Sequence, residues 1–360
     1  MDNSLIQKIN SNNPLDVLES FKNVDDNSRY IEHIPTGIPE FDEALEGGLT
    51  PGFTVLGAES SYGKSTLAFQ ITKNLLAQGK RVLIFSLEMN EKQILSKLVS
   101  MSSYELNKEN SEKWIFTSNN TFSHKYMSDL KQGDHFIDYE EAVDRIKAIQ
   151  TLENQFKIIT PDKRQITAAD IEEYVKTYMQ LYPAEKPIVF VDYLQILGKS
   201  VAGESDLQKV TTDIEKLHML AMTEDIVVFT LSSINRAGYN KNADMSSFKG
   251  SGNIEFSADT LLKIVFKDSD VQGFDMNKAK AKEERDYEII ILKQRMGKTG
   301  ISVPCKFITK ASYFEFGRIT EDSLVTEYTE FEPVADNVVP FSTIPEDEED
   351  TTPDVLDLFS

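Results

Sequence analysis

The 360-residue chain carries a net charge of −21, from 59 acidic and 38 basic residues. Such an excess of negative charge repels nucleic acid, so any contact with DNA requires a local basic patch. The single cysteine, Cys305, excludes an internal disulfide and a multi-cysteine zinc site. No apolar run approaches the ~20 residues of a membrane span, and the N-terminus lacks the pattern of a signal peptide. We therefore expect a cytoplasmic protein with no membrane partner.

The chain divides by composition into three parts. Residues 1–30 are polar apart from an amphipathic piece at 14–21, which fits either a frayed helix or a linker helix that docks on a neighbouring subunit. Residues 329–360 are predicted to be a disordered tail, since residues 331–360 contain nine acids and no Lys or Arg. The part between them, 31–328, is the expected folded domain.

Strand and helix patterns alternate through the expected domain. Apolar runs predict strands at 53–56, 81–85, 156–159, 188–192, 226–231 and 261–266. Helical spacing predicts helices at 39–45, 67–76, 91–102, 139–150, 167–182 and 207–223. A hairpin of 288–292 with 301–308 and an edge strand at 313–316 follow. This order predicts an α/β fold with a mostly parallel central sheet, extended by a C-terminal antiparallel hairpin.

A phosphate-binding loop is predicted at residues 58–66, Ala-Glu-Ser-Ser-Tyr-Gly-Lys-Ser-Thr, between a strand and a helix. The usual pattern is Gly, four residues and Gly-Lys-Ser/Thr, and Ala58 stands at the first glycine position. Backbone N–H groups of such a loop and the N-terminus of the helix hold phosphate oxygens. Lys64 would reach the outer phosphates, and the Ser65 hydroxyl would ligate Mg²⁺. On this motif alone, a chance glycine–serine turn remains an alternative.

Two carboxylates follow predicted strands. Asp192 ends the strand at 188–192, where a carboxylate would hold Mg²⁺. Glu88 follows the strand at 81–85 and is placed to activate water, although an acid at a helix N-terminus is a common alternative. The residues expected to bind a nucleotide and its Mg²⁺ are Ser60, Ser61, Tyr62, Gly63, Lys64, Ser65, Thr66 and Asp192, with Ser65 and Asp192 as metal ligands.

These motifs together resemble the C-terminal ATPase domain of DnaB-type replicative helicases, which has a RecA-like fold. The resemblance covers roughly residues 31–318, and its further motifs lie at 35–37, 86–89, 191–195, 231–236, 251–259 and 293–300. It implies that Glu88 is the general base and that Lys64 binds phosphate. It also implies that Lys293 and Arg295 act as finger residues in the neighbouring subunit's site. Without the resemblance, we would interpret both as exposed hairpin charges.

Three features depart from the family pattern. Ser233 stands where the family usually carries Gln, which puts in doubt the coupling between nucleotide and DNA. The roughly 30 residues before the domain are too few to fold as the family's N-terminal collar, so we expect that collar to be missing. Residues 107–133 are predicted to be additional loop material.

Two loops, 198–206 and 237–252, are predicted to face DNA in a ring channel, although ordinary solvated loops explain their composition about as well. The basic candidates are Lys199, Arg236, Lys241 and Lys249, with Tyr239 and Phe248 available for stacking on bases. The tail ends in Leu356, Asp357, Leu358 and Phe359, which is similar to the peptide that docks bacterial replication proteins on the sliding clamp. Chance is a serious alternative for so short a match.

We therefore expect an ATP-dependent, ring-forming DNA helicase, a homo-hexamer that moves on single-stranded DNA in replication, in a phage or mobile element. One alternative is a recombination ATPase similar to RecA or RadA, which would share the nucleotide site. The other is a nucleotide-gated oligomeric scaffold with little motor activity. Hydrolysis that responds to single-stranded DNA would distinguish the helicase from the scaffold.

Overall fold

The computed structural model describes residues 32–108, 116–117, 136–162, 164–198, 205–234, 248 and 251–319. In these residues the strands form one nine-stranded sheet in the order β3-β2-β4-β5-β1-β6-β7-β8-β9. Neighbours from β3 to β6 pair in parallel, and the pairs from β6 to β9 are antiparallel. The predicted α/β architecture with a C-terminal antiparallel extension is confirmed.

The strands lie close to their predicted positions. They are β1 (Gly52–Ala58), β2 (Val82–Ser86), β3 (Phe156–Ile159), β4 (Ile188–Asp192), β5 (Val227–Ser233), β6 (Thr260–Phe266), β7 (Glu284–Gln294), β8 (Ile301–Ile308) and β9 (Tyr313–Phe316). The helices are α3 (Pro39–Ala44), α4 (Lys64–Ala77), α5 (Glu91–Asn107), α7 (Phe136–Ala148), α8 (Ala168–Leu181), α9 (Asp206–Glu224), α10 (Ser251–Ser257) and α11 (Met276–Ala281), with a short 3₁₀ helix, η3 (Leu194–Ile196).

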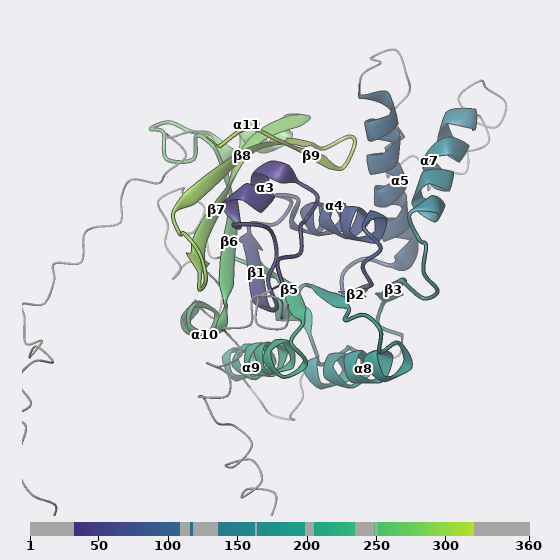
Figure 1. The fold of residues 1–360 in the computed structure, drawn as a ribbon. Coiled ribbons are helices and arrows are strands. Elements are labelled where there is room, and N and C mark those ends of the chain that lie inside the picture. Colours follow the sequence, from purple (N-terminus) through teal and green to yellow (C-terminus); the bar gives the residue numbers. More distant parts are fainter. Residues whose placement is uncertain are drawn as a thin grey trace, which may run out of the picture. The chain divides into compact units, whose positions relative to one another are not determined.

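Helices cover both faces of the parallel strands (Figure 1). Alternate residues of each strand point to opposite faces, so two apolar cores form. One core joins the sheet to α3, α4, α5 and α7, and the other joins it to α8 and α9. Burial on both sides explains why β1, β2 and β4 are mostly apolar and show no alternation of apolar and polar residues.

Local capping signals define several helix starts. Thr167, the N-cap of α8, forms a capping box with Asp170, and Asn90 does the same for α5 with Gln93. Helix α5 continues five residues beyond the predicted end at 102, and α7 begins three residues before the predicted start at 139. Further differences lie in the C-terminal half. Strand β7 is longer than expected, because it continues back to Glu284 along the whole of β8. Helix α11 lies before β7, where the charged residues at 278–285 indicate either a loop or a helix. Helix α10, which was not predicted, precedes β6.

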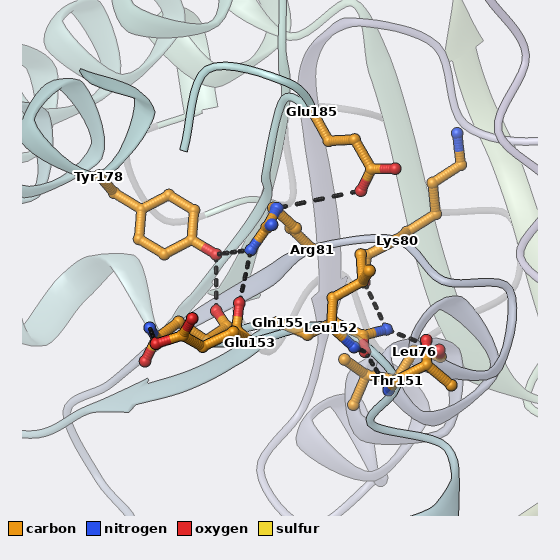
Figure 2. A network of polar contacts seen from close by, with 10 residues as sticks. Leu76, Lys80, Arg81, Thr151, Leu152, Glu153, Gln155, Tyr178 and Glu185 are labelled. Atoms are coloured by element: carbon orange, nitrogen blue, oxygen red, sulfur yellow. Dashed lines mark hydrogen bonds and ion pairs between the residues drawn. The ribbon is translucent and has the colours of Figure 1, made fainter. Parts of the chain in front are cut away.

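Polar contacts fasten the amino ends of β2 and β3 to the helices around them (Figure 2). The side-chain amide of Gln155 donates to the carbonyls of Leu76 and Lys80, at 2.8 and 3.1 Å. Arg81 donates to the hydroxyl of Tyr178 on α8 at 3.3 Å. These contacts lie at the amino edge of the sheet, opposite the strand ends that carry the predicted site, and they have a structural role. Within the described residues, no helix is both long and apolar enough to cross a membrane.

Candidate active site

The predicted nucleotide site lies at the carboxyl ends of four adjacent strands, β2, β4, β5 and β1. Sheet register brings the strand ends level, because Ser86 pairs with Asp192 and Ala58 pairs with Ser233. A cavity of about 340 Å³ opens there. This is the edge at which open α/β sheets bind ligands. The predicted residues that line the cavity are Ser60, Ser61, Gly63, Lys64, Ser65, Thr66, Glu88 and Asp192.

The phosphate loop turns sharply into α4. Ser61 and Gly63 have positive φ angles of 67° and 92°, and a Cβ on Gly63 would lie 2.8 Å from the Phe314 ring. Glycine is therefore required at position 63. Helix α4 begins without a side-chain cap and has no acidic residue in its first turn. Its first N–H groups and the positive end of its dipole are thus suited to an anion such as a phosphate.

Lys64 folds back on the loop. Its ammonium group donates to the carbonyls of Ala58 at 2.9 Å and Glu59 at 3.1 Å. The loop is also held from outside, since Lys280 forms an ion pair with Glu59 at 2.8 Å and Arg285 donates to the Ser61 carbonyl at 2.9 Å. The loop is thus shaped by contacts that leave its concave side to the cavity.

Tyr62, a predicted binding residue, does not point its side chain into the cavity. The side chain is fully buried and its ring packs against Phe266 and Tyr287, with centroids 5.0 and 5.2 Å away. Only the backbone of Tyr62 is available to a nucleotide, and the aromatic side chain anchors the loop to β6 and β7.

Asp192 and Ser65 form the predicted metal pair. The Asp192 side chain is buried, and burial, more than the nearby Glu88 carboxylate, raises its pKa to about 6. The Ser65 hydroxyl donates a hydrogen bond to the carboxylate, and this bond and the charges of Lys64 and Lys97 favour the ionised form.

The donor set fits Mg²⁺. The second carboxylate oxygen of Asp192, Oδ2, is buried and has no hydrogen-bond partner, so it is a polar atom that a cation would satisfy. No group of three or more His, Cys, Asp or Glu side chains within the described residues could hold a metal by itself. A site with one carboxylate and one hydroxyl is the kind that binds Mg²⁺ together with phosphate and water.

Glu88 stands at the mouth of the cavity on a fixed turn. The Ser86 hydroxyl donates to the Met89 carbonyl at 2.8 Å, and the Met89 N–H donates back to the hydroxyl at 3.2 Å. The Leu87 N–H donates to the Asp192 carbonyl at 2.8 Å. The side chain of Glu88 is exposed, so its carboxylate is within reach of solvent water beside the cavity.

Lys97 lines the cavity and was not predicted from sequence. It lies on α5, and its ammonium group is 3.4 Å from the Thr66 hydroxyl. Burial lowers its pKa, and the Asp192 carboxylate opposes that shift. A signal was present, because Lys97 shares a helical face with the buried residues Ile94 and Met101. The ammonium group of a lysine in an apolar stripe needs polar surroundings, and here it finds them by lining the cavity near the Thr66 hydroxyl.

Lys293 and Arg295 lie away from this cavity. Lys293 donates to the carbonyls of Glu255 and Phe256, at 2.6 and 3.4 Å. Arg295 forms an ion pair with Asp259 at 3.2 Å. The pKa of Lys293 is lowered mainly by burial and also by the charge of Arg295. The two cations therefore form a second cluster at the end of β7, separate from the residues that line the chain's own nucleotide cavity.

The predicted DNA-contacting residues Lys199, Arg236, Lys241 and Lys249 lie outside the described residues, as does the tail with Leu356, Asp357, Leu358 and Phe359. Phe248 is described, and its predicted role in base stacking is wrong. The ring is fully buried and packs so closely on β1 that a Cβ on Gly57 would lie 2.2 Å from it. A ring in that position supports the sheet and is closed to a base.

Comparisons with known proteins give a consistent picture. The model of the family described as "DnaB-like helicase C terminal domain" matches residues 33–316. A "Probable plasmid replicative DNA helicase" of Chlamydia psittaci is 27% identical over 245 residues, which are 66% of this chain and 48% of that protein. The "Replicative DNA helicase DnaB" of Helicobacter pylori strain J99 is 26% identical over 320 residues, 79% of this chain and 61% of that protein. The chain thus spans about half the length of the curated relatives it matches.

Solved structures agree on the fold. One solved ATPase domain superimposes with a TM-score of 0.63 at 22% identity, over 89% of this chain and all of that one. A DnaB-like replicative helicase whose structure was solved to study its interactions with primase gives 0.66 at 22% identity, over 86% of this chain and 69% of that one. With the family match over most of its length, the chain belongs to the DnaB-like helicase C-terminal domain family.

Proposed function

We propose that this chain is the ATP-hydrolysing motor of a replicative DNA helicase, a homo-hexameric ring that moves on single-stranded DNA. The observation that carries the proposal is the cavity at the carboxyl ends of β1, β2, β4 and β5. There a phosphate loop, a carboxylate–hydroxyl pair with one unsatisfied oxygen and an exposed glutamate meet. This set matches what phosphoryl transfer to water requires.

Each residue has a distinct task in this proposal. The N–H groups of the loop and of the first turn of α4 hold the phosphates, and Lys64 exchanges its loop carbonyls for the outer phosphate oxygens. Asp192 and Ser65 hold Mg²⁺, which, when bound, neutralises charge on the β- and γ-phosphates. Glu88 orients the attacking water and accepts its proton. Lys97 adds positive charge near the phosphates.

Lys293 and Arg295 act, in this proposal, on the neighbouring subunit's nucleotide. Support comes from their distance from their own cavity and from their contacts with backbone carbonyls of α10, which hold two like charges together. Two fixed cations beside the γ-phosphate would stabilise the charge that develops in the transition state. A site completed in this way requires a ring or a row of subunits.

ATP hydrolysis measured with and without single-stranded DNA tests the motor, for the wild type and Lys64→Ala, together with particle size in nucleotide. DNA-stimulated turnover that is lost in Lys64→Ala, in a hexamer-sized particle, is the expected result. Nucleotide binding with slow hydrolysis whose rate does not change with single-stranded DNA would refute the motor function and favour the oligomeric scaffold.

Mixing two inactive variants tests the fingers. Lys64→Ala lacks a working site but keeps its fingers, and Arg295→Ala keeps its site but lacks a finger. The mixture should regain activity that neither variant has alone, because some sites then combine both intact halves. Arg318→Ala, a change at an exposed arginine, is the matched control and should hydrolyse ATP normally. A mixture as inactive as its components would show that Arg295 does not act across subunits.

We also propose that Lys199, Arg236, Lys241 and Lys249 contact the DNA backbone. Replacing them one at a time by Gln should weaken DNA binding and reduce its salt dependence, by about one unit of slope for each lost phosphate contact. Unchanged slopes would contradict the assignment. The plasmid helicases among the relatives support a role in replication of a phage or other mobile element, in the host cytoplasm.

The tail is proposed to dock on a sliding clamp through Leu356, Asp357, Leu358 and Phe359. Its support is the apolar end that follows an acidic run. A peptide of residues 345–360 should bind the cognate clamp, and the same peptide with Leu358→Ala and Phe359→Ala should not. Absence of binding by the unmodified peptide would exclude this partner.

A further inference from the structure

Gln195 joins two parallel strands beyond the point where their backbones stop pairing. The last pair between β4 and β5 is Val191 with Thr230. Past it, the side-chain amide of Gln195 donates to the Ser232 hydroxyl at 2.8 Å and accepts from the Ser233 N–H at 3.2 Å. On its other side the end of β5 still pairs with β1, at Gly57 and Ala58. On the β4 side it is held by the side chain of Gln195.

That end of β5 belongs to the nucleotide cavity, because Ser233 lines it beside Asp192 and Tyr193. Gln195 follows these last two residues closely in the chain, on η3. A shift of β5 or of the strand end at Asp192 would therefore change both hydrogen bonds of Gln195. The amide thus contacts the end of β5, while the chain joins Gln195 to the end of β4 at Asp192.

The backbone of Gln195 faces α9. The Lys209 ammonium group donates to the Gln195 carbonyl at 3.4 Å and pairs with Asp213 at 3.2 Å. The side chains of Lys209 and Asp213 are only 7% and 1% exposed. Burying an ion pair is a poor way to stabilise a helix, since desolvation offsets the attraction. Its position beside Gln195 suggests that it fixes α9 to η3 in one arrangement.

Helix α9 in turn holds α10. The side-chain amide of Asn253 on α10 donates to the Thr211 hydroxyl at 2.5 Å. Thr211 lies on α9 between Lys209 and Asp213, the two residues of the buried ion pair. The carbonyls of α10 are those that hold Lys293 and Arg295. A continuous set of contacts thus leads from the nucleotide cavity through Gln195 and α9 to the finger cluster of the same subunit.

We propose that Gln195 is a positioning residue, through which the occupancy of the nucleotide cavity is transmitted to α9 and α10. It touches no substrate and acts through Ser233 on one side and Lys209 on the other. Its effect in the ring would be to adjust the fingers that a subunit offers its neighbour according to its own nucleotide. This inference rests on the proposed ATPase function.

Hydrogen–deuterium exchange of the full chain, with and without Mg²⁺ and a non-hydrolysable ATP analogue, tests the transmission. In the wild type, nucleotide should slow exchange in the phosphate loop and also change exchange in peptides over 205–213 and 251–257. In Gln195→Leu the phosphate loop should respond as in the wild type, while the response of the other two peptides is lost. Gln180→Leu, at an exposed position of α8, is the matched control and should behave as the wild type.

Steady-state hydrolysis provides a second readout. Gln195→Leu should lower kcat about tenfold, the loss expected for two hydrogen bonds, with KM for ATP within about twofold of the wild-type value. Ser232→Ala removes only one of these bonds and should cause a smaller loss of kcat. Combined with Gln195→Leu it should add almost nothing, because both changes remove the same contact.

The possible outcomes distinguish failure of the ATPase proposal from failure of the inference about Gln195. A wild type whose phosphate loop does not respond to nucleotide would overturn the ATPase proposal, and this inference with it. A responding loop with unresponsive α9 and α10 peptides in the wild type would overturn the inference alone. So would a Gln195→Leu variant whose α9 and α10 peptides respond normally. If Gln195→Leu unfolds, Ser232→Ala replaces it as the test of the inference. An unchanged kcat in Ser232→Ala, together with a normal exchange response of its α9 and α10 peptides, would refute the role of Gln195.

Discussion

Replacing Asp192 with Asn should make the nucleotide-free protein more stable and unable to use Mg²⁺. Burial raises the pKa of Asp192 to about 6, from the usual 3.8 of an aspartate. The folded protein therefore binds this proton more tightly than the unfolded chain, so stability falls as pH rises through this window and stays lower above it. A difference of about two pKa units corresponds to roughly 3 kcal/mol at neutral pH.

An Asn side chain has the same shape as Asp and can still accept a hydrogen bond from the Ser65 hydroxyl, but it carries no charge. We expect Asp192→Asn to gain about 1–3 kcal/mol at pH 7.5, the lower values allowing for an imperfectly satisfied amide. At pH 4.5 the wild-type carboxyl is largely protonated in the fold, so the gain should shrink by about two thirds. Added Mg²⁺ and nucleotide should stabilise the wild type but scarcely stabilise the variant.

Urea unfolding at both pH values, with chelator present and nucleotide absent, measures the gain. Asp270→Asn, at an exposed aspartate, is the control and should change stability little at either pH. The reasoning would be refuted if Asp192→Asn were no more stable than the wild type at pH 7.5. A gain of equal size at pH 4.5 would also refute it, because the charge would then not be its cause.

Other perturbations test further parts of the structure. Gly57→Ala should lower stability by about 1–3 kcal/mol in thermal unfolding, because the new methyl group would overlap the Phe248 ring. Lys97→Met should weaken nucleotide binding about tenfold, as for one lost charge-assisted contact, in a titration calorimeter. It should also move the acid limit of Mg²⁺-dependent binding to higher pH, since Lys97 favours the ionised form of Asp192. Burial raises the pKa of the Cys305 thiol, so labelling of the native protein should be more than about 100-fold slower than that of the unfolded chain.

Matched changes show which result would contradict each expectation. Gly317→Ala, where a Cβ meets only ordinary contacts from 3.4 Å, should be nearly neutral, and a loss equal to that of Gly57→Ala would contradict the overlap. Lys92 lies on the exposed face of the helix that also carries Lys97. If Lys92→Met weakened nucleotide binding as much as Lys97→Met, a local role of Lys97 at the cavity would be contradicted. Rapid labelling of Cys305 in native protein would show that β8 opens readily.

The fold was predictable because its signals are local. Buried parallel strands are short apolar runs, and Thr167 with Asp170 marks a helix start within four residues. The role proposed for Lys293 and Arg295 comes from the resemblance alone, since a partly buried Lys293 carries no signal of its own in the sequence. The unpredicted helix α10 has no apolar periodicity, and its place is set by contacts with α9 and by the cations it binds.

The candidate site, too, was predictable from the sequence only in part. The phosphate loop, Glu88 and Asp192 follow strands directly, so chain order and the rule that parallel strands end at one edge were enough to group them. Which side chains turn toward the cavity was not contained in that rule. Tyr62 turns into an aromatic cluster, while Lys97 reaches in from the next helix.

The sequence by itself determined the family, the order of the strands along the chain and the chemistry of the loop, because each depends on residues within a few positions of one another. Only the tertiary structure decided that Phe248 is core and that Gln195 connects the site to α9. Both facts depend on packing between segments far apart in the chain, such as β1 against residue 248 and η3 against Lys209. Register and packing distances between such segments arise on folding, and no local pattern contains them.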